Sequence, residues 1–269
     1  MDKYYLWDGD VPFFDPAFGQ DKPHLTAFTA KRDDGEKTSC IIVCPGGAYV
    51  GLADYEGDPV SKYFQSNGIS AFTLTYRCRP YDHNAIVADI RRAVRWVRYN
   101  ADRFNIDPEK IGVLGFSAGG HLAMLGATVF EDGIDGSDEV DSVSSRPDAA
   151  LLCYPVISMT RELTHEDTRY TLIGRLEESI KEELVKKYSG ELAVTDRTPP
   201  MFIWSTAADS CVKVENSLCM AKALSEHKIP YELHIFPDGE HGLGLAENFE
   251  GTARAWPSLA VAWLRRLGF

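Results

Sequence analysis

The sequence predicts an α/β fold built on a mainly parallel β-sheet. From about residue 39 to the C-terminus, short apolar segments of strand type alternate with longer segments of helix type. Strands separated by helices are typical of βαβ units, in which the strands run parallel. A chain of 269 residues fits one large α/β domain, and it contains no internal repeat and no low-complexity linker. We therefore expect a single domain over residues 1–269.

The expected strands are short apolar runs that cover residues 39–44, 69–75, 110–114, 149–154, 201–205 and 231–236. Continuous apolar runs suit strands that are buried on both faces of a parallel sheet. Pro155 ends the fourth of them, because proline cannot donate a hydrogen bond to the ladder. The first 30 residues are rich in proline and aromatic residues, and we expect them to form an antiparallel edge of the sheet.

Helices are expected over residues 59–67, 84–104, 120–129, 176–188, 214–227 and 252–267. Gly68 closes the first of them. The clearest pattern lies in 84–104, where apolar residues recur with a period of 3.6 residues from Ile86 to Ala101. This segment is also rich in arginine, and we expect the arginines on its solvent-exposed face.

One segment, about residues 156–197, interrupts the alternation. It lies between two expected strands and is too long for an ordinary connection. Its one clear element is the polar amphipathic helix 176–188. Because it follows the carboxyl end of a strand, where sites in open α/β sheets lie, we interpret it as a small lid over the site. A surface insertion that does not touch the substrate is the alternative.

Composition excludes several classes of partner. A formal net charge of −12 argues against nucleic acid and against an anionic membrane surface. The N-terminal residues do not form a signal peptide, and no apolar run is long enough to span a membrane. The six cysteines form no C-x-x-C pair, and no cluster of His and Cys has the spacing of metal ligands. We expect a cytoplasmic protein with free thiols, no metal and no cofactor.

The most informative motif is Gly115-Phe116-Ser117-Ala118-Gly119, which fits the G-x-S-x-G nucleophile elbow of α/β-hydrolases. A strand-type run precedes it and a helix-type run follows it, which is the context that the motif requires. The glycines permit a tight turn that exposes the serine Oγ. We therefore predict an α/β-hydrolase fold, with a mostly parallel central sheet flanked by helices and a small lid insertion, and Ser117 as its nucleophile.

Serine needs a histidine base, which a carboxylate holds in the correct tautomer. In this fold the order along the chain is serine, acid, histidine. His241 is the best base, because it lies in a glycine-rich loop after the last expected strand. Asp209 is the best acid, since it follows the strand 201–205, and Asp238 is the second choice. The alternative role for Asp209 is a helix cap. Four other histidines follow the serine: His121, which we expect to support the loop around it, His165, His227 and His234.

An oxyanion hole needs backbone N–H groups directed at the developing negative charge. One comes from the residue after the nucleophile, Ala118. The others are expected in the loop Cys44-Pro-Gly-Gly-Ala-Tyr-Val50, where Gly47 and Ala48 are our choice of donors. This loop is similar to the His-Gly-Gly-Gly loop of lipases and esterases, with Pro45 in place of the histidine.

These motifs, with Tyr76-Arg77, Thr198-Pro-Pro200 and the segment 232–244, carry a resemblance that spans about residues 39–269. The chain resembles the α/β-hydrolase esterases of the acetyl xylan esterase and feruloyl esterase-like type, which are related to the hormone-sensitive lipase group. The resemblance implies Ser117, Asp209 and His241 as the triad, and activity on acetyl esters of sugars or other short acyl esters. Such relatives often have an aspartate at the position of Ala208 and a histidine at that of Ser205.

We therefore expect a serine carboxylesterase that hydrolyses short acyl, chiefly acetyl, esters of carbohydrates such as xylo-oligosaccharides. Its partner would be a small-molecule ester, and a homodimer is compatible with the sequence. An arylformamidase-like or peptidase-like serine hydrolase on the same fold is the closest alternative. A non-catalytic binding module is a third, although such proteins typically lose a triad residue. We expect no propeller domain, which argues against a peptidase of the oligopeptidase type.

Overall fold

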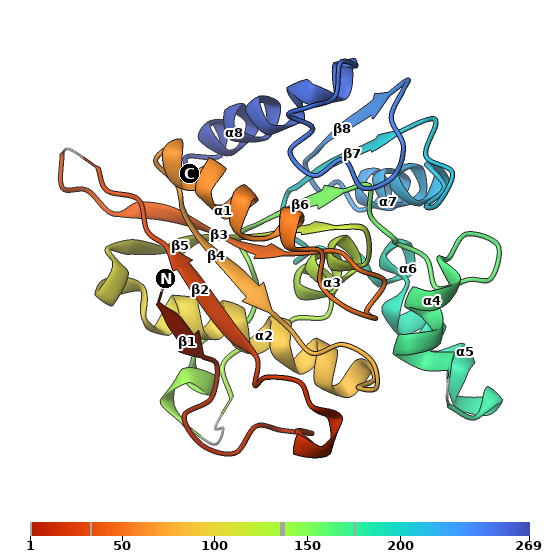
Figure 1. Cartoon of the computed structure of the whole chain (residues 1–269), viewed down its shortest axis with the longest axis horizontal. Helices are drawn as coiled ribbons and strands as arrows, with labels where there is room; N and C mark the ends of the chain where they lie inside the picture. Colours follow the sequence, from red (N-terminus) through yellow and green to blue (C-terminus); the bar gives the residue numbers. More distant parts are fainter. Residues whose placement is uncertain (1, 33, 135–137, 175) are drawn as a thin grey trace.

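The computed structural model describes residues 2–32, 34–134, 138–174 and 176–269. Within these residues, eight strands form one sheet in the order β1-β2-β4-β3-β5-β6-β7-β8 (Figure 1). The first two pairs, β1 with β2 and β2 with β4, are antiparallel, and all other pairs are parallel. The strands are β1 (Lys3–Tyr5), β2 (His24–Phe28), β3 (Thr38–Cys44), β4 (Ser70–Thr75), β5 (Ile106–Phe116), β6 (Ala149–Cys153), β7 (Met201–Thr206) and β8 (Tyr231–Phe236).

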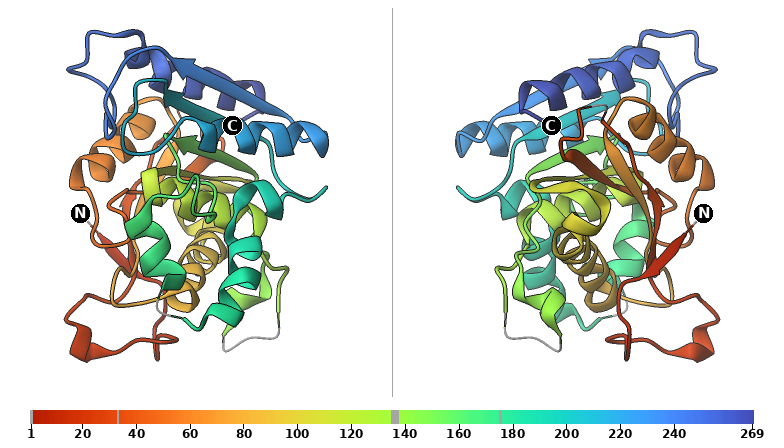
Figure 2. Two further views of the ribbon diagram at one scale, coloured as in Figure 1. Left: turned by 90° about the vertical axis from the view of Figure 1, so that its right-hand side faces the viewer. Right: turned by 90° about the vertical axis from the view of Figure 1, so that its left-hand side faces the viewer.

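Helices cover both faces of the sheet (Figures 1 and 2). One face carries α2, α3 and α7, and the other carries α1 and α8. No helix in the described part of the chain is long and apolar enough to cross a membrane. The helices are α1 (Asp58–Ser66), α2 (His83–Tyr99), α3 (Ser117–Thr128), α4 (Glu166–Arg169), α5 (Glu178–Tyr188), α6 (Gly190–Ala193), α7 (Glu215–Glu226) and α8 (Trp256–Arg266).

Alternation along each central strand divides the core into two layers. In β3, Cys40 and Ile42 pack with α2 and α3, whereas Ile41 and Val43 pack with α1 and α8. Every residue of β3 is buried. Successive side chains of a strand point to opposite faces, so a strand with helices on both sides must be apolar throughout. The mostly parallel sheet with helices on both faces confirms the predicted α/β-hydrolase class. The antiparallel pairs β1–β2 and β2–β4 confirm the predicted antiparallel N-terminal edge.

The expected elements are found, with shifted ends. The helix expected over 84–104 ends at Tyr99, and a separate 3-10 turn, η3 (Ala101–Phe104), follows it. This turn ends at Asn105, whose φ of 53° is left-handed. Asparagine tolerates this conformation better than most residues, so the chain can turn there into β5.

The expectation of a solvated arginine face on α2 is wrong. Arg92 and Arg95 are buried, because the segment that follows α3 folds back over this face of the helix. Arg92 donates to the carbonyl of Leu6 at 2.7 Å and to Asp141 at 2.9 Å, and it also pairs with Asp138. A guanidinium carries five donors, so carbonyls and carboxylates from distant segments can satisfy it away from water.

The insertion 156–197 contains α4, a π-helical turn η5 (Tyr170–Gly174), α5 and α6. Its buried apolar side chains, among them Ile157, Leu172 and Leu184, are part of the core layer formed with α2 and α3. Arg79, which follows β4, donates to Thr171 at 3.0 Å, and the Asn216 side chain of α7 accepts from the amide of Ile157 at 2.9 Å. The insertion is thus fastened to the domain on two sides. Its role as a lid stays a prediction.

Candidate active site

Ser117 lies at a sharp turn between β5 and α3, at the carboxyl end of a central strand. Its φ of 53° is left-handed, a conformation that non-glycine residues adopt rarely and at a cost of about 1 kcal/mol or more. A side chain at Gly115 would collide with the backbone of Gly119, and one at Gly119 would collide with the backbone of Cys44 and Pro45. The two glycines therefore make the turn possible, and the turn exposes Oγ.

The structure brings Ser117, His241 and Asp209 together from three loops. Ser117 Oγ lies 2.8 Å from His241 Nε2, and His241 Nδ1 lies 2.7 Å from Asp209 Oδ2. An ionised carboxylate can only accept, so Nδ1 carries the proton and Nε2 is free to accept from the serine hydroxyl. This is the tautomer that a general base requires. Asp238, the second candidate acid, is exposed and does not take this position.

Asp209 has two roles at once. Its Oδ2 accepts from His241, and its Oδ1 accepts from the amides of Cys211 and Val212, both at 2.9 Å. Burial disfavours the ionised carboxylate, but the hydrogen bonds from His241, Val212 and Cys211 outweigh it and lower the pKa of Asp209. The capping alternative is therefore compatible with the triad position, because one oxygen caps the turn 209–212 while the other faces the histidine.

The loop after β3 presents two unpaired amides beside the serine. Its backbone turns through three consecutive left-handed residues: Gly47 at φ 128°, Ala48 at φ 56° and Tyr49 at φ 58°. No acceptor in the described part of the chain pairs with the N–H of Gly47 or of Ala48. Both residues are at least partly accessible. Unpaired amides in a strained loop are what an anion-binding position offers.

Two buried side chains hold this loop. The hydroxyl of Tyr76 donates to the carbonyl of Pro45 at 2.6 Å. The hydroxyl of Tyr49 lies 2.9 Å from His121 Nδ1, and His121 Nε2 lies 2.8 Å from the carbonyl of Tyr188 in the insertion. A carbonyl only accepts, so Nε2 carries the proton and Nδ1 accepts from Tyr49. His121 thus supports the loop, as the sequence predicts, and it also joins the loop to the insertion.

Sequence analysis did not identify Glu56 and Tyr154 as residues of the site. Glu56 belongs to the 3-10 turn η2 (Asp54–Glu56), and in sequence it resembles any surface acid, yet only 2% of it is exposed. It accepts from the amide of Gly46 at 2.8 Å and from the Tyr154 hydroxyl at 2.6 Å. The Tyr154 ring packs edge-on against His241, with 5.0 Å between ring centroids. No local pattern marks either residue; only their burial and their contacts do.

The three other histidines that follow the serine in sequence lie outside the triad. His227 is exposed and ends α7. His234, in β8, bonds to Glu232 at 2.9 Å and stacks on Phe236. His165, from the insertion, is half-buried, and burial lowers its pKa, partly opposed by Asp167. Lys213, four residues after Asp209, donates to the carbonyl of Glu162 at 2.9 Å, so the insertion contacts the segment that follows the acid.

Two grooves flank this arrangement. One, of about 460 Å³, lies beside His241 between Tyr55 and the segment 242–249, and it is lined largely by apolar side chains such as Leu243 and Phe249. Gly242 and Gly244 have positive φ, and a side chain would press on the Tyr55 hydroxyl at Gly242 and on the Tyr55 ring at Gly244. The Tyr55 ring is therefore seated directly against the backbone that follows the histidine, which makes it one wall of a short apolar groove.

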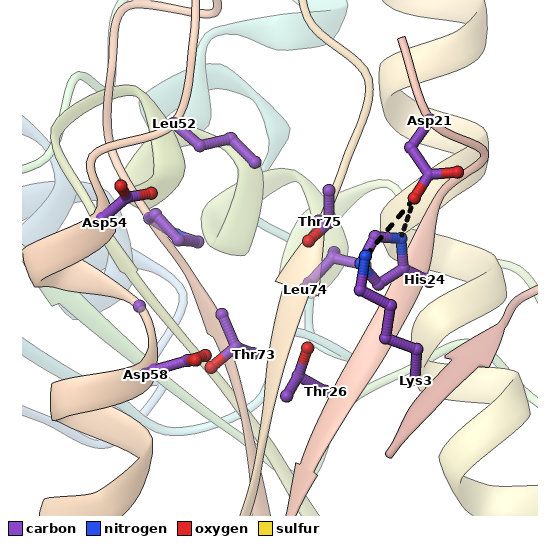
Figure 3. A pocket seen from close by; sticks show the side chains of 12 residues that line it. Lys3, Asp21, His24, Thr26, Leu52, Asp54, Asp58, Thr73, Leu74 and Thr75 are labelled. Carbon is purple, nitrogen blue, oxygen red and sulfur yellow. Dashed lines mark ion pairs between the residues drawn. The ribbon is translucent and has the colours of Figure 1, made fainter. Parts of the chain in front are cut away.

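The other groove, of about 470 Å³, lies next to Pro45 on the β2–β4 side (Figure 3). It is lined by threonine hydroxyls of β2 and β4 and by carboxylates of Asp54 and Asp58. Lys3 and His24 both face Asp21, at 3.5 Å and 3.6 Å. None of the triad residues lines this groove, so it is separate from the serine.

Comparison with known proteins places the chain in a family. The family model described as BD-FAE matches residues 27–224. An acetyl ester-xyloside bifunctional hydrolase from Caldicellulosiruptor lactoaceticus is 46% identical, with a TM-score of 0.94, 100% coverage of this chain and 97% of the other.

Two curated relatives are longer. "Endo-1,4-beta-xylanase B" of Butyrivibrio fibrisolvens is 41% identical over 90% of this chain and 38% of its own length. "Acetylxylan esterase" of Xylanibacter ruminicola is 31% identical over 85% of this chain and 45% of its own length. The chain thus spans less than half of each. The predicted resemblance is confirmed: the chain belongs to the BD-FAE family and is similar to α/β-hydrolases of the acetyl xylan esterase type.

Proposed function

We propose that this chain is a serine carboxylesterase that hydrolyses short acyl esters, chiefly acetyl esters of carbohydrates such as xylo-oligosaccharides. The observation that carries the proposal is the hydrogen-bonded series Ser117–His241–Asp209, with its distances of 2.8 Å and 2.7 Å. The names of the relatives in Caldicellulosiruptor lactoaceticus and Xylanibacter ruminicola support an acetylated sugar as the substrate.

In the proposed reaction, Ser117 Oγ attacks the ester carbonyl carbon while His241 Nε2 takes the hydroxyl proton. Asp209 stabilises the imidazolium that forms and keeps it oriented. The tetrahedral oxyanion is bound by the amides of Gly47, Ala48 and Ala118. As the carbon–oxygen bond to the alcohol breaks, the imidazolium protonates the leaving oxygen. Water then attacks the acyl-enzyme through the same histidine and releases the carboxylic acid.

The surroundings of the serine include an apolar groove that could take part of the substrate. The apolar groove beside His241 begins at Gly242, and Tyr55 and Phe249 give it an aromatic lining. The groove lies beside the base, where the leaving alcohol must receive its proton. It could therefore hold either the alcohol part or the acyl part of the ester.

The proposal is tested with p-nitrophenyl acetate on the wild type and on Ser117→Ala, followed by acetylated xylo-oligosaccharides. Ser258→Ala is the matched control, since Ser258 is an exposed serine on α8 whose hydroxyl bonds only to the preceding turn. We expect hydrolysis by the wild type and by Ser258→Ala, and loss of the rate in Ser117→Ala. Absence of ester hydrolysis by the wild type, with turnover of N-formylkynurenine or of a peptide, would establish the alternative serine hydrolases instead. No turnover of any of these would favour the binding module.

A further inference from the structure

The buried carboxylate of Glu56 connects two loops that the reaction needs in fixed positions. One is the loop after β3, which carries Gly47 and Ala48, and the other is the loop that carries His241. Glu56 has 2% of its surface exposed, and both of its oxygens are engaged. Oε2 accepts from the amide of Gly46 at 2.8 Å, and Oε1 accepts from the Tyr154 hydroxyl at 2.6 Å. A carboxylate that accepts two hydrogen bonds in a dry site fixes both donors, because each donor would be costly to leave unpaired there.

The first contact reaches the oxyanion loop at the residue before Gly47. Gly46 is packed so tightly that a side chain there would lie 2.5 Å from Glu56 Oε2, 2.9 Å from the carbonyl of Phe116 and 3.2 Å from Ser117 Cβ. Glu56 thus holds Gly46 against the nucleophile turn. The amides of Gly47 and Ala48 follow directly in the chain, so their direction depends on this contact.

The second contact, with Tyr154, leads to the loop that carries His241. Tyr154 donates its hydroxyl proton to Glu56 and accepts from the amide of Gly244 at 2.9 Å. Its ring packs against His241. The carbonyl of Gly244 accepts in turn from Trp256 at 2.9 Å. One chain of hydrogen bonds therefore runs from Gly46 through Glu56 and Tyr154 to Gly244, three residues after the base.

We propose that Glu56 is a positioning residue, which acts through Gly46 and Tyr154 to hold the oxyanion-loop amides and His241 in register with Ser117. This proposal rests on the esterase function proposed above. Burial raises the pKa of Glu56, while the hydrogen bonds from Tyr154 and Gly46 and the charge of His241 oppose that effect.

The experiment compares Glu56→Ala, Glu56→Gln and Tyr154→Phe in the full chain. The readouts are kcat and KM for p-nitrophenyl acetate, the thermal midpoint, and the second-order rate of Ser117 phosphonylation by a fluorophosphonate. The fluorophosphonate reports on the nucleophile and the oxyanion hole without an ester substrate. Two controls match the changes. Glu191 is a half-buried glutamate that accepts from Ser158 at 2.6 Å, and Tyr81 is a buried tyrosine that bonds to the backbone of Asp15.

We expect Glu56→Ala to lower kcat and the phosphonylation rate by about 100-fold, the effect of losing an oxyanion-hole donor, with KM changed less than about threefold. In Glu56→Gln, kcat and the phosphonylation rate should stay within about tenfold of the wild-type values, because the amide oxygen still accepts from Gly46. Tyr154→Phe should lower kcat about tenfold and add little in combination with Glu56→Ala, since both break one series of bonds. Glu191→Gln and Tyr81→Phe should keep the wild-type kcat and phosphonylation rate.

Wild-type kcat and phosphonylation rates in folded Glu56→Ala would overturn the proposal, as would a loss confined to the thermal midpoint. If Glu56→Ala does not fold, Tyr154→Phe and Glu56→Gln decide, and unchanged rates in both would refute it. Failure of the esterase function looks different, because the wild type itself would then leave the ester uncleaved, whether or not Ser117 is phosphonylated.

Discussion

Acidification is expected to destabilise the fold through His121. This side chain is fully buried, and its neutral form is fully hydrogen-bonded to Tyr49 and to the carbonyl of Tyr188. Burial lowers its pKa from 6.5 to about 4, an effect that the hydrogen bond to Tyr188 only partly opposes. A second proton, on Nδ1, would have to replace the hydrogen bond from the Tyr49 hydroxyl.

The direction and size follow from linkage. Between pH 6.5 and about 4 the unfolded chain binds a proton at this residue and the folded chain does not, so stability falls as the pH falls. The contribution is intact above pH 6.5, is lost progressively down to about 4, and is constant below that. A gap from 6.5 to about 4, at about 1.4 kcal/mol per pKa unit, corresponds to about 3 kcal/mol of unfolding free energy.

The assay is urea unfolding at pH values from 7.5 to 4, on the wild type and on His121→Gln. Glutamine can donate to the carbonyl of Tyr188 and accept from Tyr49 without titrating. The variant should therefore lack about 3 kcal/mol of the wild-type loss over this interval. His227→Gln, at an exposed helix end, is the control and should follow the wild type. A difference between wild type and His121→Gln that does not change with pH would refute the reasoning.

Three further changes have defined outcomes. Asp209→Asn removes the acceptor that fixes the His241 tautomer, and steady-state kcat should fall by about 10⁴ with little change in thermal midpoint; a tenfold loss or less would contradict the assigned role. Gly46→Ala places a methyl group 2.5 Å from the carboxylate of Glu56, and should lower kcat at least about tenfold while KM stays near the wild-type value. Asp89→Asn leaves the fully buried Arg77 guanidinium unpaired, and urea unfolding should show a loss of about 3–5 kcal/mol; less than about 1 kcal/mol would show that water reaches it.

Interactions between residues close in sequence made the main elements and the triad candidates predictable. The strand β3 and the helix α3 follow from hydrophobic periodicity and from the steric demands of the glycines around Ser117, both of which act within a few residues. The order of serine, acid and histidine, together with the end of a strand before each, was enough to select Asp209 and His241. The structure brings these side chains together because parallel strands deliver their carboxyl ends to one edge of the sheet.

Long-range contacts decided the rest. Arg92 looks like a solvated residue of an amphipathic helix, and it is buried only because Asp138 and Asp141, more than 40 residues away, fold over it. Glu56 looks like a surface acid and is dry only because Tyr154, 98 residues further on, covers it. A charged side chain inside a protein is stable only with partners in place, and those partners come from other segments. The sequence by itself thus determined the elements and the triad candidates. Only the tertiary structure decided which polar groups are buried and therefore which loops are held in register.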